Sequence, residues 1–212
     1  MQPSDPPPKG LRRWFLSTDR LATSVGIVLF LMVCERVFWI ARGIIFPRVL
    51  GPAEYGIYTL GLFPVPLLTA LVGLGVPSAF GRYLSRHAAG GTLRWYLKRT
   101  YLLPIALSIV TTAIVLARPS FFSKLIFGDP SHGLVIALAA ISVPVLVLVR
   151  NLSTTFMGLK LFRAGRLVES SQVILYAVIG IPLILYSRTA AAGALGYGVS
   201  AAASVAIFAP LL

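Results

Sequence analysis

The sequence predicts an all-α, polytopic membrane protein built as a bundle of about six transmembrane helices. Hydrophobic residues make up 57% of the 212-residue chain and charged residues only 12%, well below the roughly 25% that is usual in soluble proteins. The hydrophobic residues form runs of about 20 residues, which is the length of a helix that crosses a bilayer. Most charged residues lie between these runs, and the protein is therefore expected in a membrane.

Division of the chain by this length gives an N-terminal tail and six candidate spans. Residues 1–20 begin with a proline-rich stretch, and we expect them to form a disordered or interfacial cytoplasmic tail. Residues 21–212 are expected to form the six-helix transmembrane domain. The spans are predicted at 21–46, 55–77, 96–117, 133–157, 167–187 and 189–212. Only the link SRTA separates the last two, so their boundary is the least defined.

The distribution of lysine and arginine predicts the orientation, because these residues accumulate in cytoplasmic loops. With the N-terminus inside, the cytoplasmic segments carry 13 basic residues and the outer segments carry four. The cytoplasmic set is Lys9, Arg12, Arg13, Arg20, Arg82, Arg86, Arg94, Lys98, Arg99, Arg150, Lys160, Arg163 and Arg166; the outer set is Arg48, Arg118, Lys124 and Arg188. This alternation favours six spans in an inner (plasma) membrane, with both termini cytoplasmic.

Several classes of partner and site are disfavoured by the same pattern. The net charge of +13 is spread between apolar runs, so its expected partner is anionic phospholipid and not nucleic acid. The single cysteine, Cys34, cannot form an intrachain disulfide. His87 and His132 have no neighbouring ligands, so no metal site or cofactor is expected. A membrane-embedded transferase would need clustered carboxylates for a divalent cation, and the acidic residues do not cluster, so we assign no catalytic residues.

The first span carries charges that would make its insertion into a membrane as an isolated helix only marginally favourable. Glu35 and Arg36 fall near the middle of residues 21–46, and Arg42 lies about 9 Å further along the axis. A charge at the centre of a span costs about 2.5–3.5 kcal/mol on insertion scales. Because acidic residues are too few to pair with both arginines, we expect Arg36 and Arg42 to bind an anionic group in a cavity. Glu35 is then an internal partner or coupling group, and the alternative is that the arginines snorkel to the interface.

Two further patterns concern bending and packing of the helices. Prolines fall inside five of the six spans, which is typical of transporter helices that flex and also of membrane helices in general. In the last span, Ala192, Gly196, Ser200 and Ser204 lie four residues apart on one face. Small residues at this spacing let helices approach closely, so this face is expected to pack against protein, either within the chain or in a dimer.

Two segments carry a resemblance to a known family: RVLGPAEYGIYTL at residues 48–60 and LGVPSAFGRYLSRHAAG at residues 74–90. With them the chain resembles the oligosaccharide and polysaccharide flippases, whose superfamily also contains lipid II flippases and multidrug and toxin extrusion carriers. In that family an Arg-x-Leu-Gly-Pro-x-x-Tyr-Gly turn follows the first span, and a basic Arg-Tyr segment follows the second. The series Arg36, Arg42 and Arg48 is also similar to the first helix of lipid II flippases, where arginines face the pyrophosphate of the substrate.

The resemblance implies a transporter that moves lipid-linked oligosaccharide or polysaccharide precursors across the cell membrane without catalysis. Such proteins usually have twelve to fourteen spans in two halves, so a six-span chain would be an N-terminal half, either truncated or completed by a second half or a second copy. Arg36, Arg42 and Glu35 would bind the substrate, and Arg82 and Arg86 would contact lipid phosphates. A multidrug-type exporter and a non-transporting partner in polysaccharide biosynthesis are the alternatives.

Overall fold

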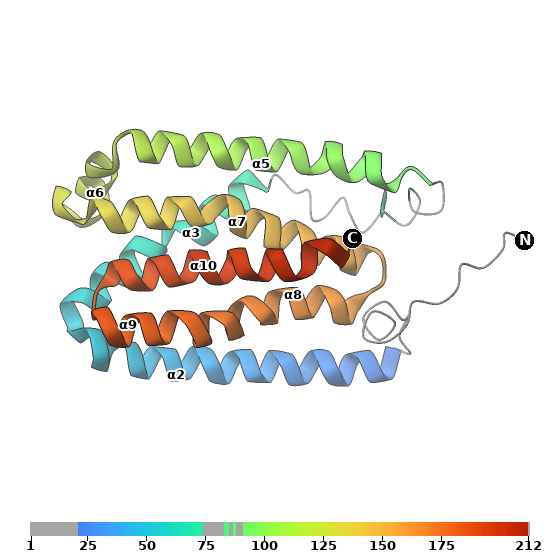
Figure 1. The fold of residues 1–212 in the computed structure, drawn as a ribbon, viewed down its shortest axis with the longest axis horizontal. Coiled ribbons are helices and arrows are strands. Elements are labelled where there is room, and N and C mark those ends of the chain that lie inside the picture. Colours follow the sequence, from blue (N-terminus) through green and yellow to red (C-terminus); the bar gives the residue numbers. More distant parts are fainter. Residues whose placement is uncertain (1–20, 74–82, 85–86, 88–90, 212) are drawn as a thin grey trace, which may run out of the picture.

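The computed structural model describes residues 21–73, 83–84, 87 and 91–211, and these residues contain helices and turns but no strand (Figure 1). The predicted all-α class is thereby confirmed for this part of the chain. The helices are α2 (Leu21–Leu62), α3 (Pro64–Val72), α5 (Leu93–Ala117), α6 (Pro119–Phe127), α7 (Gly133–Gly158), α8 (Phe162–Leu175), α9 (Ile181–Ser187) and α10 (Ala190–Phe208). Shorter turns are η1 (Pro130–His132), the π-helical η2 (Tyr176–Gly180) and η3 (Ala209–Leu211).

The long helices lie side by side in one bundle (Figure 1). α10 packs on α7, α8 and α2, while α7 also packs on α5 and α8. The chain reverses direction between α5 and α7, between α7 and α8, and between α9 and α10, and α6 lies across the end at which α5 stops (Figure 1). Antiparallel neighbours joined by short connections are typical of a helical bundle.

Four stretches of the described chain are long and apolar enough to cross a membrane: Trp95–Ala117, Pro130–Gly158, Phe162–Ser187 and Ala190–Phe208. They agree within a few residues with the predicted third to sixth spans, which identifies a membrane protein. The predicted spans 21–46 and 55–77 correspond to α2, α3 and residues outside the described part. The total of six spans therefore stays a prediction.

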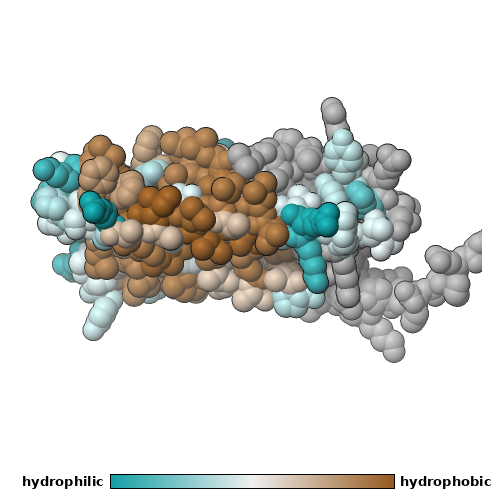
Figure 2. Space-filling view, turned by 90° about the horizontal axis from the view of Figure 1, so that it is seen from above, coloured by the Kyte–Doolittle hydropathy of each residue, from teal (hydrophilic) through white to brown (hydrophobic). Residues whose placement is uncertain are grey.

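The outer surface of the bundle is apolar, as expected where lipid is the solvent. On the face drawn in Figure 2, hydrophobic residues form a band between hydrophilic residues at the two ends. Leu102, Leu134 and Val178 on three different helices are 68%, 64% and 65% exposed. In water so many exposed large hydrophobic side chains would mark an aggregation-prone surface, but in a bilayer they are matched by acyl chains.

The turn in the RVLGPAEYG motif reverses the chain within α2. Gly51 has φ 78° and ψ 166°, a conformation that side chains with a Cβ rarely adopt, and Pro52 begins the next helical stretch. The break after Leu50 agrees with the turn predicted at Gly51 and Pro52, although the first helical stretch continues past residue 46, where the first span was expected to end. Glu54 then accepts a hydrogen bond of 2.7 Å from the backbone N–H of Ala190, so its carboxylate caps the N-terminus of α10.

The prolines act at some helix breaks and are accommodated inside other helices. Pro64 and Pro66 lie at the start of α3, just after the end of α2, and Pro182 follows the π-helical turn η2 at the start of α9. Pro104 and Pro144 lie inside the uninterrupted helices α5 and α7. Proline therefore marks some helix starts in this chain and lies within continuous helices elsewhere, and flexing of the helices stays a prediction.

The link between the last two spans is a sharp turn with defined caps. Arg188 closes α9 in the left-handed conformation, with φ 51°, and the Thr189 hydroxyl accepts a hydrogen bond from the N–H of Ala192. The two residues between α9 and α10, Arg188 and Thr189, are therefore sufficient for the reversal.

The small residues of the last span pack within the chain. Ala192, Gly196, Ser200 and Ser204 are all buried. The Ser204 hydroxyl donates to the carbonyl of Val168 at 3.0 Å, so this face of α10 lies on α8. Of the two packing modes left open by the sequence, the structure therefore shows the intrachain one.

Gly196 offers a direct test of this packing. A Cβ at Gly196 would lie 2.8 Å from the backbone Cα of Gly180, so α10 and η2 would have to separate. We expect Gly196→Ala to lower the free energy of unfolding by about 1–3 kcal/mol in detergent. Gly198→Ala is the matched control on the same helix, because its Cβ would make an ordinary contact of 3.5 Å with Ser142. Equal stability of the two variants would contradict the close approach.

Candidate functional site

Arg42 lies among aromatic side chains inside the bundle. Its Cζ is 4.0 Å from the ring centroid of Trp39, and it is 5.7, 5.6 and 5.7 Å from the centroids of Phe46, Tyr58 and Tyr176. We call these four rings the aromatic cage. A guanidinium over an aromatic face gains about 0.5–1 kcal/mol when exposed and about 2 or more when desolvated. The cage therefore offsets part of the cost of placing a cation among apolar helices.

The cage is held together by its own hydrogen bonds. The hydroxyls of Tyr58 and Tyr176 are 2.8 Å apart and hydrogen-bonded, and the Tyr176 hydroxyl also donates to the carbonyl of Gly193 at 3.3 Å. Gly193 must be a glycine here, because a Cβ would lie 2.7 Å from the ring of Tyr58. Phe46, Tyr58 and Tyr176 are almost fully buried, whereas Trp39 is 46% exposed. Three rings thus form a fixed floor, and the indole forms an accessible edge.

Arg42 has no acidic partner in the described part of the chain. The ion pairs there join Arg166 with Glu35 and with Glu169, and none includes Arg42. A guanidinium carries five N–H donors. Within the described residues Arg42 combines ring contacts that stabilise its charge with donors that no carboxylate occupies.

Arg42 lines a cavity that is open on one side. A cavity of about 160 Å³ is lined by Arg42, Trp39, Tyr58, Thr59, Leu62, Phe63, Pro66 and Tyr197. A second cavity of about 240 Å³ shares Pro66 and Tyr197 with the first and is also lined by Thr69, Leu146, Val149, Arg150, Glu169 and Gln172. We call the two adjoining cavities the polar groove. Helices α2, α3, α7, α8 and α10 all contribute to it.

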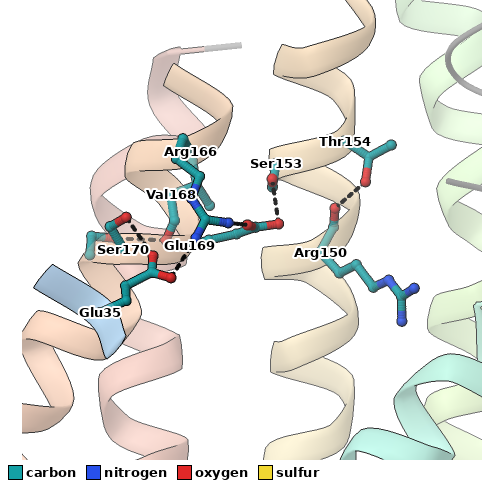
Figure 3. A network of polar contacts seen from close by, with 9 residues as sticks. Glu35, Arg150, Ser153, Thr154, Arg166, Val168, Glu169 and Ser170 are labelled. Carbon is teal, nitrogen blue, oxygen red and sulfur yellow. Dashed lines mark hydrogen bonds and ion pairs between the residues drawn. The ribbon is translucent and has the colours of Figure 1, made fainter. Parts of the chain in front are cut away.

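Arg150 is the second arginine of the polar groove. Its side chain is exposed and, among the described residues, takes part in no hydrogen bond or ion pair. Figure 3 shows it turned away from the Glu169 carboxylate, which instead lies toward Ser153. The groove thus has an arginine in each of its two cavities, and its acid, Glu169, is already bonded.

Glu35 belongs to a separate polar network that joins three helices (Figure 3). Its carboxylate accepts a hydrogen bond of 2.5 Å from Arg166 Nη2 and one of 2.6 Å from the Ser170 hydroxyl. Arg166 Nη1 binds Glu169 at 2.6 Å, and Glu169 in turn accepts a hydrogen bond of 2.9 Å from Ser153. The network fixes α2 against α8 and α8 against α7 through charge-assisted hydrogen bonds.

The structure places Glu35 and Arg42 at different levels along the bundle. Arg42 contacts Tyr176, which lies within two residues of the middle of Phe162–Ser187, whereas Glu35 lies beside Ser170, about 9 Å nearer the Phe162 end. Glu35 and Arg36 are at the middle of the first helical stretch of α2, which runs from Leu21 to the break after Leu50. The depth of each charge in a membrane stays a prediction.

The other predicted site residues do not join Arg42. Arg36 is exposed on α2, and no ion pair or ring contact of its side chain occurs within the described residues. Arg82 and Arg86, predicted to contact lipid phosphates, lie outside the described residues. Of the three predicted substrate-binding residues, the structure thus places Arg42 in the polar groove, Glu35 in the network and Arg36 on the exterior.

A comparison with protein families agrees with the sequence resemblance. A family model described as a polysaccharide biosynthesis protein matches residues 22–212, nearly the whole chain. The chain belongs to this family. No match was found among curated proteins or among solved structures.

Four residues of the site and its neighbouring network are not among the site residues predicted from the sequence: Trp39, Tyr176, Arg150 and Arg166. Trp39 lies three residues before Arg42, one helical turn away, so its contact could have been predicted from spacing. Tyr176 lies 134 positions further along the chain than Arg42, and only the fold brings it near. Arg150 and Arg166 belong to a predicted cytoplasmic segment, and nothing in their local sequence distinguishes them from its other basic residues.

The Glu35 network predicts a difference in stability between neighbouring residues. Glu35→Ala removes the acceptor of Arg166 and Ser170, and we expect the free energy of unfolding to fall by about 1–3 kcal/mol. Arg36→Ala is the matched control, and we expect a change within about 0.5 kcal/mol. A Glu35→Ala loss no larger than that of Arg36→Ala would show that the network does not stabilise the bundle.

Proposed function

We propose that the protein is a flippase that moves lipid-linked oligosaccharide or polysaccharide precursors across the cytoplasmic membrane. The observation that carries this proposal is Arg42, a guanidinium that aromatic rings stabilise inside an apolar bundle and that lines an open cavity. The family match supports a role in polysaccharide biosynthesis. The proposal requires binding and movement of the substrate, and no bond of the substrate is made or broken.

The phosphate or pyrophosphate of the lipid carrier is the group that Arg42 would bind. A guanidinium matches phosphate oxygens with two parallel hydrogen bonds, and a site shielded from water strengthens them. Arg150 in the second cavity offers the same chemistry, so an anionic head group could pass from one arginine to the other. The polar groove is too small for a saccharide chain, which would extend through its open side.

The same proposal includes six membrane spans, a cytoplasmic N-terminus and further helices that cover the open side of the polar groove. Those helices would come from a second half or a second copy. The excess of basic residues in the segments predicted to be cytoplasmic supports the six spans and their orientation. The position of the groove at the surface of the bundle supports the additional helices. A multidrug-type exporter is less well supported, because a cationic substrate would meet Arg42 and Arg150, and because Glu169 is already bonded to Arg166.

Substitution of Arg42 tests the proposed function. In cells that depend on the protein for surface polysaccharide, we expect Arg42→Ala to lower export about 10- to 150-fold at normal abundance in the membrane, the factor that one charge-assisted hydrogen-bonding pair contributes. Arg42→Lys should recover export only in part, because a point charge replaces the planar fork.

Arg48→Ala is the control for this experiment, because Arg48 is exposed near the end of the same helical stretch and faces neither cavity. It should leave export unchanged. Unchanged export in Arg42→Ala, with protein abundance equal to wild type, would contradict a role in substrate binding. Parallel loss of abundance and export would show instead that Arg42 serves the fold.

A further inference from the structure

A further cavity lies between α3, α5, α6 and α7, apart from the polar groove. Its volume is about 310 Å³, and nearly all its lining is apolar. Three of its lining residues are small: Gly61 on α2, and Ala139 and Ala140 on α7. The hydroxyl of Thr111, a polar group in the lining, is already bonded to the carbonyl of Leu107 at 2.9 Å. We call this space the apolar cavity.

The apolar cavity lies near one end of the bundle. Val115 lies two residues before the end of α5, and Ile136 three residues after the start of α7, so the cavity extends about 10 Å inward from the turn that joins them. That depth corresponds to part of a single leaflet. The short helix α6 crosses this end, with Phe122 and Ile126 lining the cavity and Leu125 71% exposed on the outside.

Water and an empty void are both poor occupants of the apolar cavity. A buried water needs two to four polar partners, and the lining offers none beyond the engaged Thr111 hydroxyl. An empty space forfeits the van der Waals contacts of its walls. The exposed hydrophobic side chains around it, such as Ile114 at 58%, place the cavity mouth against the hydrocarbon of the bilayer. An acyl chain fits both the chemistry and the access.

The rim of the apolar cavity carries positive charge. Arg118 lies in the chain between Val115 and Phe122, which both line the cavity, and it is exposed. Its side chain forms no ion pair within the described residues. Asp129 at the same end is engaged by Ser131, whose N–H and hydroxyl donate to the carboxylate at 3.0 and 2.7 Å. Arg118 is therefore available to a phosphate.

We propose that the apolar cavity is a binding site for one anionic phospholipid, with an acyl chain between α3, α5, α6 and α7 and the phosphate at Arg118. This site is at the opposite end of the bundle from the lysine- and arginine-rich segments predicted to hold lipid at the cytoplasmic face. It depends on membrane insertion and not on the transport function. Selectivity for an anionic lipid comes from the charge at the rim. The acyl chain contributes little to it, because the chain moves from the apolar bilayer into an equally apolar cavity.

The site is tested by filling it. In native mass spectrometry of the purified protein with added phosphatidylglycerol, we expect the wild type to retain one lipid and Ala140→Leu to lose it. Ala140 lines the cavity and is 5% exposed. Ala113→Leu is the matched control, because Ala113 is exposed on α5 and its leucine would point away from the cavity. Ala139→Leu is a second filling variant, and circular dichroism checks that each variant folds.

The charge at the rim is tested separately. Arg118→Ala should lower the preference for phosphatidylglycerol over phosphatidylcholine about fivefold, the factor expected from one basic residue at the membrane surface. Arg188→Ala, which removes an exposed arginine near the same end, should leave the preference unchanged. Retention of the lipid by folded Ala140→Leu and Ala139→Leu, absence of a retained lipid in the wild type, or an unchanged preference in Arg118→Ala would each overturn the proposal.

Discussion

The charge of Arg42 is the feature on which the arrangement of this bundle depends, because a guanidinium among apolar helices must be stabilised by its surroundings. Aromatic rings provide that stabilisation here, and they come from distant parts of the chain. Trp39 and Phe46 share the first stretch of α2, Tyr58 follows the turn at Gly51, and Tyr176 begins the π-helical turn η2. The turn and η2 thus bring two of the four rings into contact with the cation. A carboxylate in place of the rings would have neutralised the charge and occupied its donors.

Glu35 and Arg42 show two solutions to the same physical problem on one helix. Glu35 is paired with Arg166 and bonded to Ser170, and its hydrogen-bonding capacity is largely used within the protein. Arg42 is stabilised by aromatic rings, pairs with no carboxylate among the described residues, and lines the polar groove. The first arrangement fixes neighbouring helices, and the second leaves a binding group. This difference is why we propose substrate binding for Arg42 and a structural role for Glu35, although the sequence placed both in the same site.

The sequence predicted the helices better than their contacts. Apolar runs near the length of a bilayer located α5, α7, α8 with α9, and α10 within a few residues, since hydropathy depends on local composition alone. The motif at residues 48–60 predicted the turn at Gly51 for the same reason. Depth and pairing depend on register between helices, so the contact of Arg42 with Tyr176 and the pairing of Glu35 with Arg166 could not be deduced. Arg36, predicted with Arg42 from its charge and spacing, lies instead on the exterior.

The most direct test of the central claim is the guanidinium NMR signal of Arg42 in lipid nanodiscs, assigned by its absence in Arg42→Lys. In the free protein the Nε–H resonance should show the upfield shift that the rings of Trp39 and Tyr58 impose on nearby protons. Addition of a prenyl pyrophosphate should move this resonance downfield in a saturable way, because the N–H groups then donate to phosphate oxygens. A resonance without a ring-induced shift would contradict the aromatic cage. A ring-shifted resonance that does not respond to the pyrophosphate would contradict the assignment of Arg42 as the anion-binding group.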